Sequence, residues 1–271
     1  MKRIMAGVAL AVTLTACGVS TQQEVEMGQQ YSAQINQQLP IVQDPEINRY
    51  LNLIGDSIAR LTSRSDLTEA NAWKFYMVDS KEVNAFAVPG GYVYVNRGLI
   101  ERTQRMDQLA GVLGHEIGHV VRRHSIKQMQ QQQGANFGVT LACVLTSVCN
   151  SQVGQAAIQV GGTAIFARFS RSDENEADEE GIRNTIRAGI SPNGVPEMFQ
   201  ILINERKSNP SGVEGWFATH PMEEDRIAST RALIATYDPA IIRSLPTDSR
   251  NYQAFKARVR SLPPSPTPRT R

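Results

Sequence analysis

The chain has 271 residues, of which 41% are hydrophobic and 6% aromatic, a composition typical of a globular protein. It carries 28 Lys plus Arg against 26 Asp plus Glu, and because Lys2 and Arg3 lie in a leader that we expect to be removed, the mature balance is 26 against 26. This balance argues against a nucleic-acid-binding protein, which needs a surplus of basic residues, and no apolar run beyond the first twenty residues reaches the roughly 18 that a membrane-spanning helix requires.

Residues 1–16 have the layout of a secretory signal peptide, with two basic residues, an apolar stretch and small residues before Cys17. The segment Leu14-Thr15-Ala16-Cys17 resembles the lipobox of bacterial lipoproteins, which implies cleavage before Cys17 and a lipid anchor on it. An ordinary exported protein is the alternative. Because Gly18 follows, the resemblance implies the inner leaflet of the outer membrane, with the protein facing the periplasm.

Two helices are expected next. The Gln-rich segment 22–38 has apolar residues at helical spacing and ends before Pro40. We assign 17–43 to a lipid tether and an N-terminal helix. Asp44 and Pro45 then form an N-cap and first turn, so a second helix begins there.

Three short strands follow the second helix. Residues 73–78 alternate as a strand, and the segments 85–88 and 92–95 flank a tight turn at Pro89-Gly90-Gly91. A small sheet of about three strands beside a mainly helical chain predicts an α+β fold. We expect the domain to span 44–245.

A further helix is expected after Arg105, with Leu109, Leu113, Ile117 and Val120 facing the core. His115 and His119 lie on the other side of this helix and are expected to face a cleft.

The segment His115-Glu116-Ile117-Gly118-His119 is an H-E-x-x-H motif. Histidines four apart on one helix face can bind one Zn²⁺, and Glu116 can take a proton from the water that zinc activates. Gly114 and Gly118 each weaken a helix, so we expect another segment to approach closely there. His124 is nine residues from the first ligand, about 180° around a continuous helix, so we interpret it as a capping, packing or outer histidine rather than a ligand.

Cys143 and Cys149 lie in an apolar stretch of an exported chain. A disulfide between them is expected, with two buried free thiols as the alternative, because one continuous helix would hold the thiols too far apart.

The third zinc ligand is expected in the charged segment 170–178, where a helix begins near Ser170. Glu174 and Asp178 are four apart on one face, so one can bind zinc while the other accepts the free N–H of a zinc-bound imidazole. Glu176 faces the opposite side and is the second choice for the ligand.

With HEIGH followed about 55 residues later by SRSDENEAD, the chain resembles the glutamate-zincins, and among them metallopeptidase family 48 of the HtpX and CAAX prenyl protease type. The resemblance implies a zincin-type metallopeptidase domain, Glu174 as the ligand and Asp178 as the acceptor. It covers about 73–231 and includes no tetratricopeptide repeats. The small periplasmic lipoproteins of the family are the most similar members.

The resemblance extends upstream and downstream of the motif. Asn84-Ala85-Phe86 matches the family's strand ahead of the zinc helix, which implies an edge strand that pairs with an extended substrate. Thr219-His220-Pro221 matches its His-Pro segment. His220 could stabilise the oxyanion, fill a fourth zinc position and hold the enzyme latent, or only pack, and Arg226 could contact substrate.

The C-terminal segment 246–271 is expected to be a tail, and its Pro-rich end, from Leu262, to be disordered. The function that we infer is that of a zinc metalloendopeptidase, with one zinc per chain, that cleaves extended or misfolded cell-envelope proteins and has Glu116 as general base. Other envelope proteins are also candidates for its partners. The alternative is a binding or chaperone-like lipoprotein whose zinc site is closed by His220.

Overall fold

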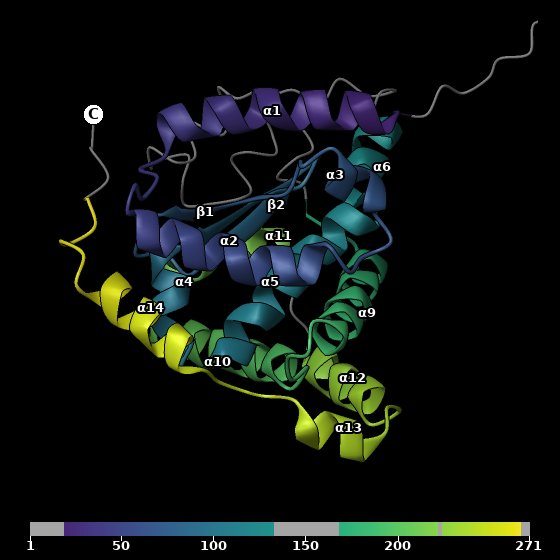
Figure 1. The fold of residues 1–271 in the computed structure, drawn as a ribbon, viewed down its shortest axis with the longest axis vertical. Coiled ribbons are helices and arrows are strands. Elements are labelled where there is room, and N and C mark those ends of the chain that lie inside the picture. Colours follow the sequence, from purple (N-terminus) through teal and green to yellow (C-terminus); the bar gives the residue numbers. More distant parts are fainter. Residues whose placement is uncertain (1–18, 133–167, 222–223, 267–271) are drawn as a thin grey trace, which may run out of the picture.

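The computed structural model describes residues 19–132, 168–221 and 224–266 (Figure 1). The expected leader with Cys17, and the cysteines Cys143 and Cys149, lie outside the described residues. Among the helices that the structure describes, none is both long and apolar enough to cross a bilayer.

The two N-terminal helices form at or close to their predicted positions. Helix α1 (Thr21–Gln38) begins after Ser20, whose side chain and that of Gln23 form a capping box. Helix α2 (Pro45–Ala59) begins after Asp44, whose carboxylate accepts the backbone N–H groups of Glu46 and Ile47. The short helix α3 (Ser65–Glu69) follows.

The three predicted strands form one mixed sheet in the order β1-β3-β2. Strand β1 (Lys74–Val78) runs parallel to β3 (Tyr92–Asn96), and β2 (Ala85–Val88) pairs with β3 antiparallel. Gly90 and Gly91, with φ of 80° and 94°, form the turn between β2 and β3. The α+β fold class is therefore confirmed.

Alternating side chains give the sheet two buried faces. One face packs against α1 through a separate apolar cluster that includes Ile35, Tyr92 and Tyr94. The opposite face, with Val93 and Val95, belongs to the main core together with α2 and α5. Figure 1 shows α1 lying across the sheet on the side away from most of the other helices.

The rest of the described chain is helical. Its elements are α4 (Arg97–Arg102), α5 (Met106–Val121), α6 (His124–Gln132), α9 (Arg171–Arg187), α10 (Gly194–Ser208), η3 (Pro210–Gly212), α11 (Glu214–Thr219), α12 (Glu224–Ile234), α13 (Pro239–Ser244) and α14 (Arg250–Arg260).

Helix α5 crosses α9 at very close range. A Cβ atom added to Gly118 would lie 2.7 Å from the Ala177 carbonyl oxygen, and one added to Gly114 would lie 3.1 Å from the Cα of Gly181. The close approach that the two glycines of α5 predicted is thus provided by α9, the helix that contains the acidic segment.

The C-terminal expectation needs a correction. Helix α14 lies within 246–271 and contributes Tyr252, Phe255 and Val259 to the main core. Residues 262–266 do not form a free tail, because the Arg97 guanidinium donates to the carbonyls of Leu262 and Pro263. Proline prevents a helix there, but it does not prevent an extended segment from packing.

Candidate active site

The side chains of His115, His119 and Glu174 meet where α5 crosses α9. The Nε2 atoms of the two histidines lie 3.1 Å apart, and they lie 3.6 and 3.5 Å from the Glu174 carboxylate oxygens. With His220, which follows α11, the potential ligand atoms all lie within 4.8 Å of one another. We call these four residues the metal-site cluster. Each is at most 2% exposed, so the two motif histidines are buried and do not face an open cleft.

The cluster fits a divalent cation of the zinc type. Ligand bonds of about 2.0–2.1 Å in a tetrahedron place neighbouring ligand atoms roughly 3.3 Å apart, close to the three separations measured among the histidines and Glu174. Glu174 Oε1 and His220 Nε2 are buried without a hydrogen-bond partner in the part of the chain that the structure describes. Buried polar atoms are rarely left unpaired, and a bound cation would supply a partner for both.

Asp178 and Arg226 form hydrogen bonds with two members of the metal-site cluster, His115 and Glu174. Asp178 Oδ1 lies 2.8 Å from His115 Nδ1 and accepts the hydrogen of the imidazole nitrogen that faces away from the cluster. Arg226 donates from Nε and Nη2 to Asp178, at 2.9 and 2.7 Å, and from Nη1 to Glu174. Its guanidinium therefore spans both carboxylates instead of facing a substrate site.

Glu116 of α5 lies on the side of the site that is next to strand β2. Its carboxylate accepts the backbone N–H of Ala87, and its Oε1 lies 3.5 Å from His220 Nε2 without a hydrogen-bond partner among the described residues. Burial raises the pKa of Glu116 to about 8, although the Ala87 N–H and Arg226 act in the opposite direction. Such a group can take up and return a proton near neutral pH.

Burial shifts the pKa of every member of the metal-site cluster toward the neutral form of its side chain. Burial lowers the pKa of His115, His119 and His220, which keeps the imidazoles neutral, the form that binds metals. Burial also raises the pKa of Glu174 well above its ordinary value in the absence of a cation. The pKa of Asp178 is lowered because Arg226 and His115 outweigh the effect of burial.

Three side chains to which the sequence analysis gave no role contact the histidines. Phe169 stacks on His119 with ring centroids 3.9 Å apart, and Trp216 stacks on His220 at 4.5 Å. Thr219 Oγ1 lies 2.8 Å from His220 Nδ1. Of these contacts, only that of Trp216 has a local signal in the sequence. Trp216 lies four residues before His220, a spacing that places two side chains about one helical turn apart.

The interpretation of His124 was partly wrong. We placed it on the far side of one continuous helix, but α5 ends at Val121 and Arg123 has a φ of 57°. The chain reverses there, and His124 Nδ1 lies 2.9 Å from His119 Nδ1. Glu176, the second choice for the ligand, lies outside the metal-site cluster, and its Oε2 is 3.5 Å from His124 Nε2.

The residues expected to bind substrate lie at an edge of the sheet. Asn84 immediately precedes β2, and β2 pairs only with β3 within the described sheet. The Ala87 N–H is directed to Glu116, away from β3, and in an antiparallel pair alternate residues face the same edge. The backbone of Ala85 therefore faces the outer edge as well, whereas Phe86 faces β3.

The chain is similar to one known protein family and to several known proteins. Residues 46–234 match peptidase family M48. The chain is 30% identical over 251 residues to the beta-barrel assembly-enhancing protease of Escherichia coli strain K12, which covers 89% of this chain and 49% of that protein. The protein of Vibrio cholerae serotype O1 described as a putative beta-barrel assembly-enhancing protease is 31% identical over 235 residues, which cover 84% of this chain and 47% of that protein.

Shorter relatives match as well. Metalloprotease LoiP of Escherichia coli is 31% identical over 59% of this chain and 61% of its own length. The mitochondrial metalloendopeptidase OMA1 of Schizosaccharomyces pombe is 29% identical over 66% of this chain and 50% of its own length. The chain spans about half the length of the two β-barrel assembly relatives.

Proposed function

Because the chain belongs to peptidase family M48, we propose that it is a zinc-dependent metalloendopeptidase of the cell envelope that cleaves extended or misfolded proteins. As a member of this family the chain is a peptidase. We propose the metal, the roles of the residues, the substrate and the location of the protein from the observations that follow.

The proposed ligands are His115, His119 and Glu174, with one zinc ion per chain. The single observation that carries this assignment is the convergence of their ligand atoms, 3.1 to 3.6 Å apart, in a buried place where Glu174 Oε1 has no other partner among the described residues. When bound, zinc supplies Lewis acidity, which lowers the pKa of a bound water toward about 7 and polarises a carbonyl.

Glu116 is the proposed general base. Its unpartnered Oε1 takes the proton that water loses as it attacks the peptide carbonyl carbon, and the protonated carboxyl then returns that proton to the leaving amine. Ala87 holds the carboxylate through its backbone N–H, which ties the proton-transfer group to the edge strand.

An extended polypeptide is the proposed substrate. The outer edge of β2 presents the N–H and C=O of Ala85, and a peptide that adds to this edge forms main-chain hydrogen bonds with little dependence on sequence. The Ala87 contact then directs the peptide past Glu116.

The envelope location is proposed from two observations. The lipobox-like segment before Cys17 implies a lipid anchor, and two relatives are named for enhancing β-barrel assembly. We therefore propose that the chain is attached through Cys17 to the inner leaflet of the outer membrane, faces the periplasm and acts on envelope proteins.

The test is a measurement of zinc content and of cleavage of unfolded casein by the purified mature chain. Wild type should contain one zinc and cleave casein, and Glu116→Gln should keep the zinc but lose at least about 100-fold in kcat/KM, because general acid–base catalysis contributes about 10²–10⁴-fold. Loss of zinc in Glu116→Gln, or full activity of that variant, would contradict the assigned role.

A second candidate is a binding lipoprotein in which His220 closes the zinc site. It is favoured by the position of His220, whose ligand atom lies within 4.8 Å of the other three. His220→Ala distinguishes the candidates in the same assay. If only this variant cleaves casein, the enzyme is latent; if wild type and variant both bind zinc and are inert, the binding lipoprotein is the better account.

A further inference from the structure

The two histidines of the H-E-x-x-H motif have different partners at their outer nitrogens. His115 Nδ1 contacts the carboxylate of Asp178, the usual kind of partner for a metal-binding imidazole. His119 Nδ1 instead contacts Nδ1 of His124, at 2.9 Å. His124 is completely buried, and nothing in the motif itself calls for a second histidine there.

Hydrogen-bond chemistry fixes the tautomers of this pair. For Nε2 of His119 to bind a metal, its hydrogen must be on Nδ1, which therefore donates to His124. Nδ1 of His124 is then the acceptor, so the hydrogen of His124 is on Nε2. That atom lies 3.5 Å from carboxylate oxygens of both Asp173 and Glu176. These distances are long for hydrogen bonds. The negative charges of the two carboxylates nevertheless favour a hydrogen on Nε2 of His124, which leaves the lone pair of its Nδ1 free to accept from His119.

The position of His124 depends on the turn that precedes it. Arg123 has a φ of 57°, a conformation that residues with a side chain rarely adopt, and this turn directs His124 back onto the last turn of α5. The Arg123 side chain is held at its far end, where Nε lies 2.9 Å from Glu24 Oε2 and Nη2 donates to the carbonyl of Val19.

Glu24 therefore connects the N-terminal helix to this turn. It lies on α1, is 1% exposed and also accepts from both terminal nitrogens of Arg64 at 3.2 Å. Arg64 in turn donates to the carbonyl of Val120, one residue after the second motif histidine. Two arginines thus join Glu24 to the end of α5, while the apolar contacts of α1 with the sheet form a cluster of their own.

We infer that Glu24 positions the metal ligand His119 through Arg123 and His124, so that docking of α1 and metal binding stabilise each other. The inference rests on the proposed metal site, since it concerns one of its ligands. Glu24, Arg123 and His124 are positioning residues and do not touch the metal. Because coupling between two sites is reciprocal, whatever loosens α1 weakens metal binding, and metal binding in turn holds α1 more firmly.

The first experiment measures the zinc dissociation constant by competition with a chelator, together with the visible absorption bands of the Co²⁺-substituted protein. His124→Leu should weaken zinc binding about 10–100-fold, the usual effect of removing an outer partner, and should shift the cobalt bands. His124→Gln, which restores a hydrogen-bond acceptor, should recover part of the affinity. A residue that only filled space would not show this difference.

The second experiment tests the connection to α1. Arg123→Gly keeps the unusual turn, because glycine adopts positive φ readily, but removes the contact with Glu24. Arg123→Gly and Glu24→Gln should each weaken zinc binding several-fold. The double variant should lose less than the two single losses combined, since both changes break the contact between Glu24 and Arg123, while only Glu24→Gln also alters the contact with Arg64. The control is Arg60→Gln, which removes an exposed ion pair with Asp56 on α2 and should leave zinc affinity unchanged.

Hydrogen exchange gives the reciprocal measurement. Zinc should slow amide exchange in α1 of the wild type, and it should do so less in Arg123→Gly. If zinc affinity, cobalt bands and α1 exchange of Arg123→Gly equal those of wild type, the inference is overturned while the zinc site stands. If wild type binds no zinc, the proposed function fails first. If Glu24→Gln does not fold, the result for Arg123→Gly alone tests the inference. Arg123→Gly leaves the contact between Glu24 and Arg64 intact, so the N-terminal helix keeps that contact in this variant.

Discussion

Arg226 forms hydrogen bonds with two carboxylates of the site, Glu174 and Asp178. Its guanidinium donates to Glu174 and Asp178 and, at 3.2 Å, to the carbonyl oxygen of Pro221. Its central carbon lies 4.4 Å from the centroid of the Phe199 ring. The side chain is only 5% exposed. A residue so fully engaged orients Glu174, the proposed ligand, and Asp178, and these contacts explain its position without the substrate contact that the sequence suggested.

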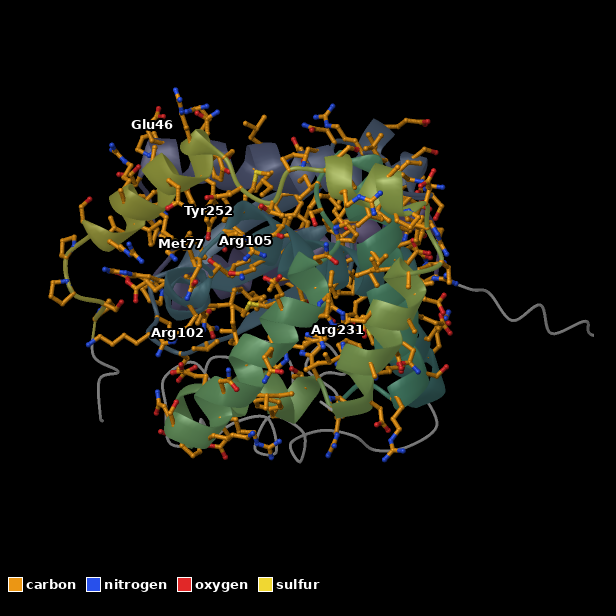
Figure 2. All side chains as sticks on the ribbon, turned by 90° about the horizontal axis from the view of Figure 1, so that it is seen from below. Glu46, Met77, Arg102, Arg105, Arg231 and Tyr252 are labelled. Atoms are coloured by element: carbon orange, nitrogen blue, oxygen red, sulfur yellow. The ribbon has the colours of Figure 1, made fainter. Side chains whose placement is uncertain are left out.

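We expect Arg226→Leu to destabilise the metal-free protein by about 3–5 kcal/mol, because it leaves two buried carboxylates without their cation. Added zinc should recover part of this loss by supplying positive charge. Urea denaturation with and without zinc measures both effects. Arg231→Leu is the control, since Arg231 is an exposed arginine of the same helix, labelled in Figure 2, and should change stability by less than about 0.5 kcal/mol. Equal losses in the two variants would contradict the assigned role.

At the scale of elements, the site depends on how closely α9 approaches α5. Helix α9 carries Glu174 and Asp178, and the absence of a side chain at Gly118 allows the Ala177 backbone to lie against α5. This contact sets the distance between the histidines of one helix and the carboxylates of the other. The helix-weakening glycines of the motif therefore have a packing role.

Gly118→Ala should lower the free energy of unfolding by about 1–3 kcal/mol, the usual effect of overpacking, despite the better helix propensity of alanine. The new methyl group would lie 2.7 Å from the Ala177 carbonyl oxygen, which belongs to the backbone and cannot rotate away. Gly114→Ala, whose nearest neighbour is 3.1 Å away, should cost less. Urea denaturation of the metal-free variants measures both, and the reverse order would refute the packing account.

A second prediction at this scale concerns the contact of α1 with α3. The Asp66 carboxylate accepts from Arg64 Nε at 2.9 Å and from Thr21 Oγ1 at 2.7 Å. Burial raises its pKa, but these hydrogen bonds outweigh burial and lower the pKa of Asp66 to about 2. A folded-state pKa below the unfolded value of 3.8 means that the interaction stabilises the fold above about pH 4 and is lost as the pH falls toward 2.

Asp66→Asn should therefore be less stable than wild type at pH 6, and the gap should narrow to roughly half at pH 3. Denaturant unfolding of the metal-free proteins at the two pH values measures the gap. Asp56→Asn, which removes only an exposed pair with Arg60, should produce a small gap at both. A gap for Asp66→Asn that stays constant between pH 6 and pH 3 would show that its carboxylate is not held in the charged form.

At the scale of the whole molecule, the C-terminal helix completes the core that the N-terminal half begins. Tyr252 of α14 is fully buried, and its hydroxyl forms a hydrogen bond with that of Thr103. Phe255 stacks on Tyr50 of α2 with ring centroids 4.7 Å apart. Figure 2 labels Tyr252 on the inner side of α14, and this helix packs against α2 and α4, beside which it lies in Figure 1.

Tyr252→Ala should lower the free energy of unfolding by about 3–5 kcal/mol, as removal of a buried aromatic side chain usually does. Arg260→Ala, an exposed change near the end of the same helix, should have almost no effect. Thermal and urea denaturation test this pair. If both variants were as stable as wild type, α14 would be a dispensable tail, as the proline content of the C-terminal segment first suggested.

Elements with a strong local signal were predictable. Asp44 and Pro45 marked the start of α2, and alternating residues marked the three strands. The histidine pair of α5 and the pair Glu174 and Asp178 of α9 were found by the same kind of reasoning, because helical spacing alone places residues four apart on one face. Local patterns depend on neighbours in the chain, so the sequence contains them in full.

The sequence by itself thus determined that this chain has a short sheet, a motif helix and an acidic helix, whose side chains form a candidate metal site. Only the tertiary structure decided what surrounds those residues. One positive φ at Arg123, held by Glu24 about a hundred residues away in the chain, turned His124 toward the site. The position of Arg226 between two carboxylates was likewise set by how α12 packs. Such contacts depend on the relative placement of distant segments, which buried packing fixes and helical spacing does not encode.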